Sequence, residues 1–309
     1  MTHLAREYGI RITPMNVIDK IVMMSPGNVA AVRGPLGYSF ERGAASGSLE
    51  SELYGQLAAA RVRFHTGVDS RELAGQYDRV VVATGSPFWA MARGRWSDVF
   101  RAWARGAVME GRFDPTTLLV WFNKAYANNG FAYLGAFDTH RASLVLIVSD
   151  VREAEVEARW RLFLATEKIP WRETGSFLIE HNSGIAYPRQ FENLIFTGNA
   201  AGLLDYLLGF GVYFAIISGV LAARSIYEGS SYEEKIRFLV RMVYQSYLAR
   251  LTLNQMDNAG YDRLLGVLNS TPVNRAVYHS RLNVFEFVEH AALAAGGRPP
   301  LYDKFFPPD

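Results

Sequence analysis

The chain has 309 residues, half of them apolar and a fifth charged, a normal balance for a globular protein of one large or two moderate domains. Its formal net charge of +2 is too small to indicate a nucleic-acid-binding surface. Because the chain has no cysteine, disulfides, thiolate metal sites and a catalytic thiolate are excluded. No cleavable apolar leader is apparent, so we expect a cytoplasmic protein.

The first hundred residues predict short strands and helices in mixed order. We expect a helix that ends near Gly9, a hairpin with strands at 21–24 and 29–32, a helix over 48–60, and strands at 62–64 and 79–82. The run Val80-Val81-Val82 is uninterrupted and β-branched, which is typical of parallel strands in a sheet interior.

Between residues 115 and 148 the pattern changes to antiparallel strands. These are expected at 118–122, 131–137 and 143–148, with a turn at Asn128-Asn129-Gly130. A helix over 150–167 follows, with Asp150 as its cap and Glu153 completing a capping box. Later elements are a strand and loop over 171–185, helices over 231–256 and 282–295, and a proline-rich surface strap over 298–309.

The most informative segment spans residues 193–225. A short apolar strand (194–196) leads through glycines and small residues into a long apolar helix. Glycines let a flat or anionic ligand approach the backbone, and a helix N-terminus offers unpaired N–H groups. This order of elements predicts a cofactor site.

Part of this segment, residues 203–223, is long enough to cross a membrane and carries one charge, that of Asp205. Gly209 and Gly211 interrupt its first half, and no basic cluster flanks it. We therefore favour a buried helix packed beneath a cofactor. Asp205 is either a functional group with a shifted pKa or a loop acceptor for backbone N–H groups, and we favour the second.

The same segment resembles flavoproteins of the geranylgeranyl reductase family, within the aromatic-hydroxylase-like group. Those proteins have a strand, Gly-Asp-Ala-Ala-Gly, a proline-rich loop, Gly-x-Gly and a helix of small residues; this chain has Gly198-Asn199-Ala200-Ala201-Gly202, then Gly209-Phe210-Gly211 and a small-residue helix. The resemblance implies that the residue after the first glycine binds the ribityl chain of FAD and that Gly-x-Gly lies along the flavin ring. Asn199 stands in place of the family's Asp, and Tyr206 in place of its usual Pro.

A second part of the resemblance is Ala83-Thr84-Gly85, which in such flavoproteins closes a strand beside the adenosine part of FAD. It also implies that Arg42 lies near the flavin crevice and Val68 near the adenine; a surface arginine and a core valine are the alternatives. The implied cofactor contacts are Gly198, Asn199, Ala200, Ala201, Gly202, Gly209, Phe210, Gly211, Val212, Ala83, Thr84, Gly85 and Arg42.

The fold implied is mixed α/β: a three-layer FAD/NAD(P)-binding-like domain, an antiparallel sheet substrate domain and C-terminal helices. We expect the first to combine residues 1–100 and 190–230, the second to span 101–189 and the third 231–309. The family's N-terminal Gly-x-Gly-x-x-Gly unit, which grips the pyrophosphate, does not occur in this sequence. We therefore expect the three-layer domain to be incomplete and strand 79–82 partly unpaired, with a truncated product, a second polypeptide or loss of FAD as explanations.

The function implied is a FAD-dependent oxidoreductase acting on a hydrophobic substrate, with a polyprenyl lipid as a candidate substrate and NAD(P)H as a candidate reductant. The family's sheet forms the substrate cavity, so the aromatics here are either its wall or sheet core: Trp121, Phe122, Tyr126, Phe131, Tyr133 and Phe137. The alternatives are a flavin-free remnant acting as a subunit and a lipid-binding module peripheral to a membrane. The six histidines lack metal-ligand spacing, no Gly-x-Ser-x-Gly occurs, and no residue is assigned a catalytic role.

Overall fold

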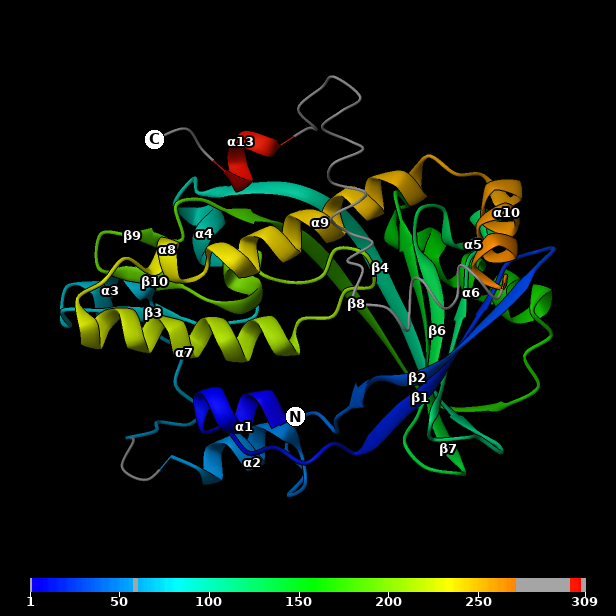
Figure 1. Ribbon diagram of the computed structural model, residues 1–309, viewed down its shortest axis with the longest axis horizontal. Helices are drawn as coiled ribbons and strands as arrows, with labels where there is room; N and C mark the ends of the chain where they lie inside the picture. Colours follow the sequence, from blue (N-terminus) through cyan, green and yellow to red (C-terminus); the bar gives the residue numbers. More distant parts are fainter. Residues whose placement is uncertain (1, 58–60, 271–300, 307–309) are drawn as a thin grey trace. The chain divides into compact units, whose positions relative to one another are not determined.

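A computed structural model describes residues 2–57, 61–270 and 301–306 (Figure 1). The chain divides into two compact units. Unit 1 combines Met1–Val62, Ala102–His181 and Met256–Leu282, and unit 2 combines Arg63–Arg101, Asn182–Gln255 and Asn283–Asp309.

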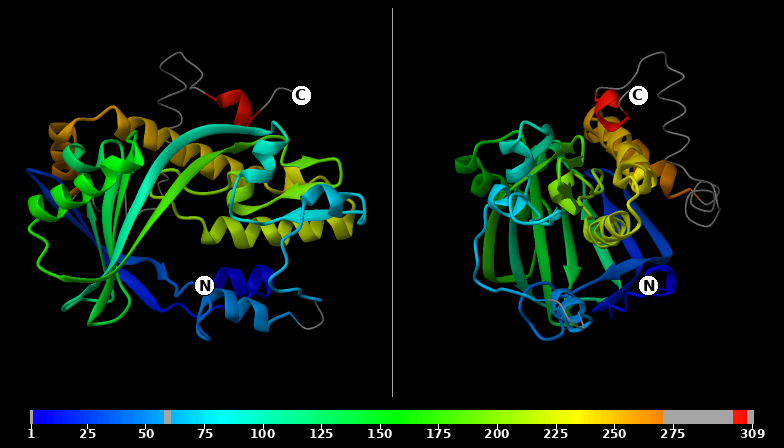
Figure 2. Two further views of the ribbon diagram at one scale, coloured as in Figure 1. Left: turned by 180° about the vertical axis from the view of Figure 1, so that it is seen from behind. Right: turned by 90° about the vertical axis from the view of Figure 1, so that its left-hand side faces the viewer.

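Unit 1 is built on a seven-stranded sheet of order β2-β1-β5-β6-β7-β4-β8. Its strands are β1 (Asn16–Met24), β2 (Val29–Ser39), β4 (Trp96–Glu110), β5 (Thr117–Trp121), β6 (Phe131–Ala136), β7 (Arg141–Ser149) and β8 (Arg172–Ala186). β1 and β5 are parallel, whereas β1–β2, β5–β6, β6–β7 and β4–β7 are antiparallel pairs. The right-hand view of Figure 2 looks onto these strands. The predicted hairpin and antiparallel strands are confirmed.

One face of this sheet packs against α6 (Glu153–Thr166). Trp160 and Phe163 of α6 join buried side chains of β4, β6 and β7 in one apolar core. The predicted cap of this helix is wrong: α6 begins at Glu153, Arg152 is its N-cap, and the Arg152 backbone N–H donates to the Glu155 carboxylate. Asp150 has left-handed backbone (φ 58°), so it belongs to the turn before the helix, where it accepts from the Ser149 hydroxyl.

Four shorter helices complete the described part of unit 1: α1 (Thr2–Tyr8), α2 (Leu49–Gly55), α5 (Lys124–Ala127) and α10 (Asn258–Leu268). The Ser48 hydroxyl caps α2, which ends earlier than predicted. On α10, the Asp262 carboxylate accepts hydrogen bonds from the Ser25 hydroxyl and the Gly27 N–H, which fixes the turn of the β1–β2 hairpin. The strand predicted at 62–64 is wrong, because those residues form no regular element.

Unit 2 contains a three-stranded sheet of order β3-β10-β9, with β3 (Val80–Val82) and β10 (Leu194–Phe196) parallel and β9 (Gln190–Phe191) antiparallel to β10. The predicted strand at 79–82 is thus confirmed, and it lies at one end of the strand order. The helices are α3 (Ser70–Ala74), α4 (Phe88–Ala92), the 3-10 helix η1 (Gly198–Ala201), α7 (Val212–Glu228), α8 (Tyr232–Lys235), α9 (Arg237–Asn254) and α13 (Tyr302–Phe305).

The predicted helix over 231–256 is two helices, because the chain turns at the buried Ile236 between α8 and α9. The helix predicted over 282–295 lies outside the described residues; of the predicted strap, residues 302–305 form α13. Residues 16–39, predicted to belong with 190–230, form two strands of the large sheet. The two units divide after Arg101 within β4 and after His181 within β8; the three-domain division remains a prediction.

Residues 203–211 form a loop, and the apolar helix α7 starts only at Val212. Within residues 2–57, 61–270 and 301–306, no helix is both long and apolar enough to cross a membrane. The same residues hold no group of three His, Asp or Glu side chains placed to bind a metal ion.

Candidate functional site

The strand-to-helix junction of unit 2 is built around η1. The buried strand β10 ends at Phe196, and the Gly198 N–H at the start of η1 donates to the Ser218 hydroxyl of α7 (2.9 Å). Gly202 ends η1 with left-handed backbone (φ 74°), and a Cβ there would lie 1.9 Å from the Gly184 carbonyl oxygen. Glycine is therefore the residue that this close approach of two backbones requires.

Two sequence motifs meet at Asn199. Its side-chain Nδ2 donates to the carbonyl of Gly85 (2.8 Å), which joins the Ala83-Thr84-Gly85 end of β3 to η1. The Asn199 Oδ1 atom is buried and has no hydrogen-bond partner among the described residues. A buried acceptor without a donor costs free energy, so this atom fits a ligand hydroxyl or N–H.

The loop from 203 to 211 is anchored to two other parts of unit 2. The Tyr206 hydroxyl donates to the Gly184 carbonyl (2.6 Å), and its backbone N–H donates to the Ser246 hydroxyl of α9 (2.9 Å). The guanidinium of Arg250, also on α9 and only 3% exposed, donates to the carbonyls of Tyr206 (3.1 Å) and Leu207. Tyr206 thus anchors the loop through a side-chain hydrogen bond, which a proline at this position lacks.

Asp205 is a loop acceptor, as favoured from the sequence. Its carboxylate accepts from the backbone N–H of Leu207 (2.8 Å). Burial raises the pKa of Asp205, while hydrogen bonds from the Leu207 and Leu208 N–H groups and Ser246, and the charge of Arg250, act in the opposite direction. The carboxyl group of Asp205 therefore stabilises the conformation of the loop.

The end of this loop is open. Gly209 has left-handed backbone (φ 78°), and no atom of another described residue lies within 4 Å of where its Cβ would be, its chain neighbours aside. Gly211 is the N-cap of α7, no side chain caps that helix start among the described residues, and Phe210 is 55% exposed. Open glycine backbone at the positive end of a 17-residue helix can accept the edge of a flat, electron-rich ring.

Of the predicted cofactor contacts, Gly198–Gly202, Gly209–Val212 and Ala83–Gly85 all lie in unit 2. Arg42 lies in unit 1, where its exposed guanidinium donates to the Glu50 carboxylate (2.5 Å). Val68 is 49% exposed, so the alternative of a core valine is wrong.

Five of the six aromatic residues considered as cavity wall or sheet core fall into two groups. Trp121 and Tyr126 pack against Phe163 in the core beneath α6, and the Tyr126 hydroxyl donates to the Glu167 carboxylate (2.9 Å). Phe122 and Phe131 form a second ring cluster that reaches Tyr133 and, on α10, Tyr261. Burial raises the pKa of the half-buried Tyr133.

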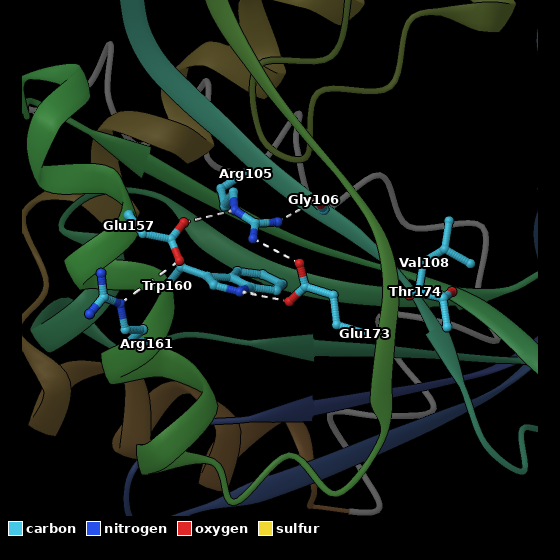
Figure 3. A network of polar contacts seen from close by, with 8 residues as sticks. All are labelled: Arg105, Gly106, Val108, Glu157, Trp160, Arg161, Glu173 and Thr174. Carbon is cyan, nitrogen blue, oxygen red and sulfur yellow. Dashed lines mark hydrogen bonds and ion pairs between the residues drawn. The ribbon is translucent and has the colours of Figure 1, made fainter.

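Sequence reasoning missed a network centred on Arg105 in unit 1 (Figure 3). Its guanidinium contacts Glu157 of α6 (3.1 Å), Glu173 of β8 (2.8 Å) and the Gly106 carbonyl (2.7 Å), and lies 4.6 Å from the Trp160 ring centroid. Burial acts to lower the pKa of Arg105, but the two carboxylates outweigh it and raise the pKa. The network joins β4, α6 and β8, and a cavity of about 640 Å³ beside it is lined by α6, Arg105 and residues 176–178 of β8.

Arg105 and Arg250 share one sequence signal, an arginine at a position whose neighbours in the helix or strand are apolar. An arginine among apolar neighbours is predicted to be buried with them. Because arginine is rarely buried without partners, such a position also predicts hydrogen-bond or ion-pair partners. Apart from the adjacent Gly106 carbonyl, the hydrogen-bond partners named above lie 43 to 68 residues away along the chain.

No protein-family model and no curated protein sequence matches the chain. Among solved structures it resembles a geranylgeranyl bacteriochlorophyll reductase-like protein from Thermoplasma acidophilum, with a TM-score of 0.67 and 14% identity over 93% of this chain and 86% of that one. It also resembles a flavin-dependent brominase, with a TM-score of 0.54 and 12% identity over 90% and 82% of the two chains. The chain therefore has the mixed α/β fold of these two solved structures, as predicted.

Proposed function

We propose that this chain is a FAD-dependent oxidoreductase that acts on a hydrophobic substrate of the polyprenyl type. The observation that carries the proposal is the buried Oδ1 atom of Asn199, which has no hydrogen-bond partner in the part of the chain that the structure describes, while the Nδ2 atom of the same side chain donates to the Gly85 carbonyl. The likeness of the fold to a geranylgeranyl bacteriochlorophyll reductase-like protein and to a flavin-dependent brominase supports the same proposal.

The residues fit the ring and ribityl portion of a flavin. Asn199 Oδ1 would accept a ribityl hydroxyl, and the open backbone of Gly209–Val212 would lie along the ring edge, where the N-terminus of α7 favours negative charge. Arg250 and Ser246 would hold that loop in place through the backbone of residues 206 and 207. When bound, the flavin would supply hydride transfer, and the protein would supply placement and a dry surface.

The substrate class and the reductant are further parts of the proposal. Phe210, exposed beside the glycine loop, offers an apolar contact for a hydrophobic substrate. NAD(P)H is the proposed reductant, and a cytoplasmic location, with contact to the membrane surface where a polyprenyl lipid lies, is the proposed setting.

The test compares FAD with riboflavin, titrated into the purified chain and followed by flavin fluorescence and the visible absorption band. Because the proposed contacts are to the ring and ribityl portion, we expect both to bind, with similar affinity. A much higher affinity for FAD would assign further contacts to its adenosine diphosphate portion. If neither flavin binds, the flavin-free alternative, in which the chain acts as a subunit or binding module, takes precedence.

A further inference from the structure

Among the described residues, the outer strand of the large sheet, β8, has an open edge. β8 ends the strand order of the sheet, with β4 as its neighbour on one side. Thr174 donates from its hydroxyl to the Val108 carbonyl of β4, and every residue from 172 to 180 is exposed. From this edge we propose that two copies of the chain form a two-fold symmetric dimer in which their β8 strands pair antiparallel and join the two sheets. The proposal is independent of flavin binding.

The two edges of the sheet differ in how they are protected. The edge strand β2 contains Gly34, Pro35 and Gly37, its pairing with β1 has a register irregularity, and α10 is bonded to its hairpin turn. Proline, bulges and covering elements are the usual means by which proteins prevent edge-to-edge pairing. In the outer half of β8, Thr174–Ile179 contains neither proline nor charge, and all six residues are exposed.

The open stretch of β8 is also apolar on both faces. Phe177, Leu178 and Ile179 are 39%, 40% and 56% exposed, and successive side chains of a strand point to opposite faces. Beside them is the cavity of about 640 Å³ that Leu178 shares with Ala154 and Val156 of α6. An added strand would therefore cover apolar surface as well as satisfy the backbone groups of the edge.

The charges of β8 are complementary to those of a second copy in one register. Antiparallel pairing centred on Ser176 places Arg172 opposite Glu180 of the second copy, and the two-fold axis repeats this pair. Shifting one strand by one residue would place Glu173 opposite Glu180 of the second copy, which is repulsive. Centring the pairing on Phe177 would lose both Arg172–Glu180 pairs. The exposed Arg172 guanidinium also contacts Glu110 of its own chain and has five N–H donors, enough to bind both carboxylates.

The dimer is expected to be weak. A pair of strands of this length buries less than the roughly 1,200 Å² of a standard stable interface. We therefore expect a reversible monomer–dimer equilibrium in sedimentation velocity, with the dimer growing as the concentration of the intact chain rises. In hydrogen–deuterium exchange, the amides of residues 174–179 should become protected at high concentration, while those of the other edge strand, β2, should not change.

Variants that reverse the charges of Arg172 and Glu180 test the register of the paired β8 strands. Arg172→Glu and Glu180→Arg should each weaken dimerisation about tenfold, because each turns two attractive pairs into repulsive ones, and the double variant should restore it. Ile179→Lys should abolish dimerisation, whereas Val17→Lys, an exposed apolar residue on β1, is the matched control and should leave it unchanged. A monomer at every concentration would overturn the proposal. So would a dimer whose formation leaves the exchange of residues 174–179 unchanged, or one that the charge variants do not affect; the exchange measurement needs no variant to fold.

Discussion

Replacing Arg105 with methionine tests whether the network of Figure 3 holds β4, α6 and β8 together. Methionine keeps an apolar stem against Trp160 but removes the guanidinium. The loss includes the hydrogen bond to the Gly106 carbonyl, about 1 kcal/mol, and the stacking on Trp160, also about 1 kcal/mol. The ion pairs with Glu173, which is one-third exposed, and Glu157, which is half-exposed, together add about 1 kcal/mol after solvent screening.

Arg105→Met should therefore lower the free energy of unfolding by about 3 kcal/mol, measured by urea denaturation followed by circular dichroism. Arg101→Met is the matched control on the same strand, because the Arg101 side chain is 61% exposed and pairs only with the exposed Asp98 among the described residues. We expect that control to change stability by about 0.5 kcal/mol or less. If Arg105→Met is as stable as Arg101→Met, the network does not contribute in the way the contacts indicate.

Three further predictions concern Gly202 and Asn199 of unit 2 and His181 of β8. Gly202→Ala should lower the free energy of unfolding in urea by about 3 kcal/mol or more, because the new Cβ meets the Gly184 carbonyl and alanine is strained in left-handed backbone. The control is Gly219→Ala on α7, where the described residues leave open space for a Cβ; it should be neutral or stabilising. Asn199→Ala should weaken flavin binding about fivefold, which corresponds to about 1 kcal/mol for one hydrogen bond, and an unchanged dissociation constant would remove Oδ1 from the site. Burial lowers the pKa of His181, so its contribution to the free energy of unfolding is present above the ordinary pKa of 6.5 and is lost as the pH falls through the lowered value. His181→Asn should therefore flatten this part of the dependence of the free energy of unfolding on pH. An unaltered dependence would contradict the lowered pKa.

The candidate site could be predicted from sequence to the extent that its parts are local. Strand β10, the glycines after it and helix α7 follow one another directly, so apolar patterning and glycine placement were sufficient to order them. The hydrogen bond between Asn199 and Gly85 was not predicted, because 114 residues separate the two; the resemblance implied only that both lie at the cofactor. Parallel pairing of β3 with β10 is what brings them together.

The errors have physical causes of the same kind. Asp150 has the side chain of a helix cap, but the left-handed backbone that it adopts after β7 moves the helix start to Glu153. Val68 has a core-forming side chain and yet is exposed. The buried Arg105 and Arg250 depend on partners from other elements, and no local pattern identifies which carboxylates or carbonyls those will be.

The most direct test of the central claim is flavin binding by the unmodified chain. A titration with FAD, followed by the quenching of flavin fluorescence and a shift of the visible absorption band, should show saturable binding that Asn199→Ala weakens. The outcome that would contradict the account is a correctly folded chain, with the circular dichroism of a mixed α/β protein, that leaves the spectrum and fluorescence of FAD unchanged at every concentration.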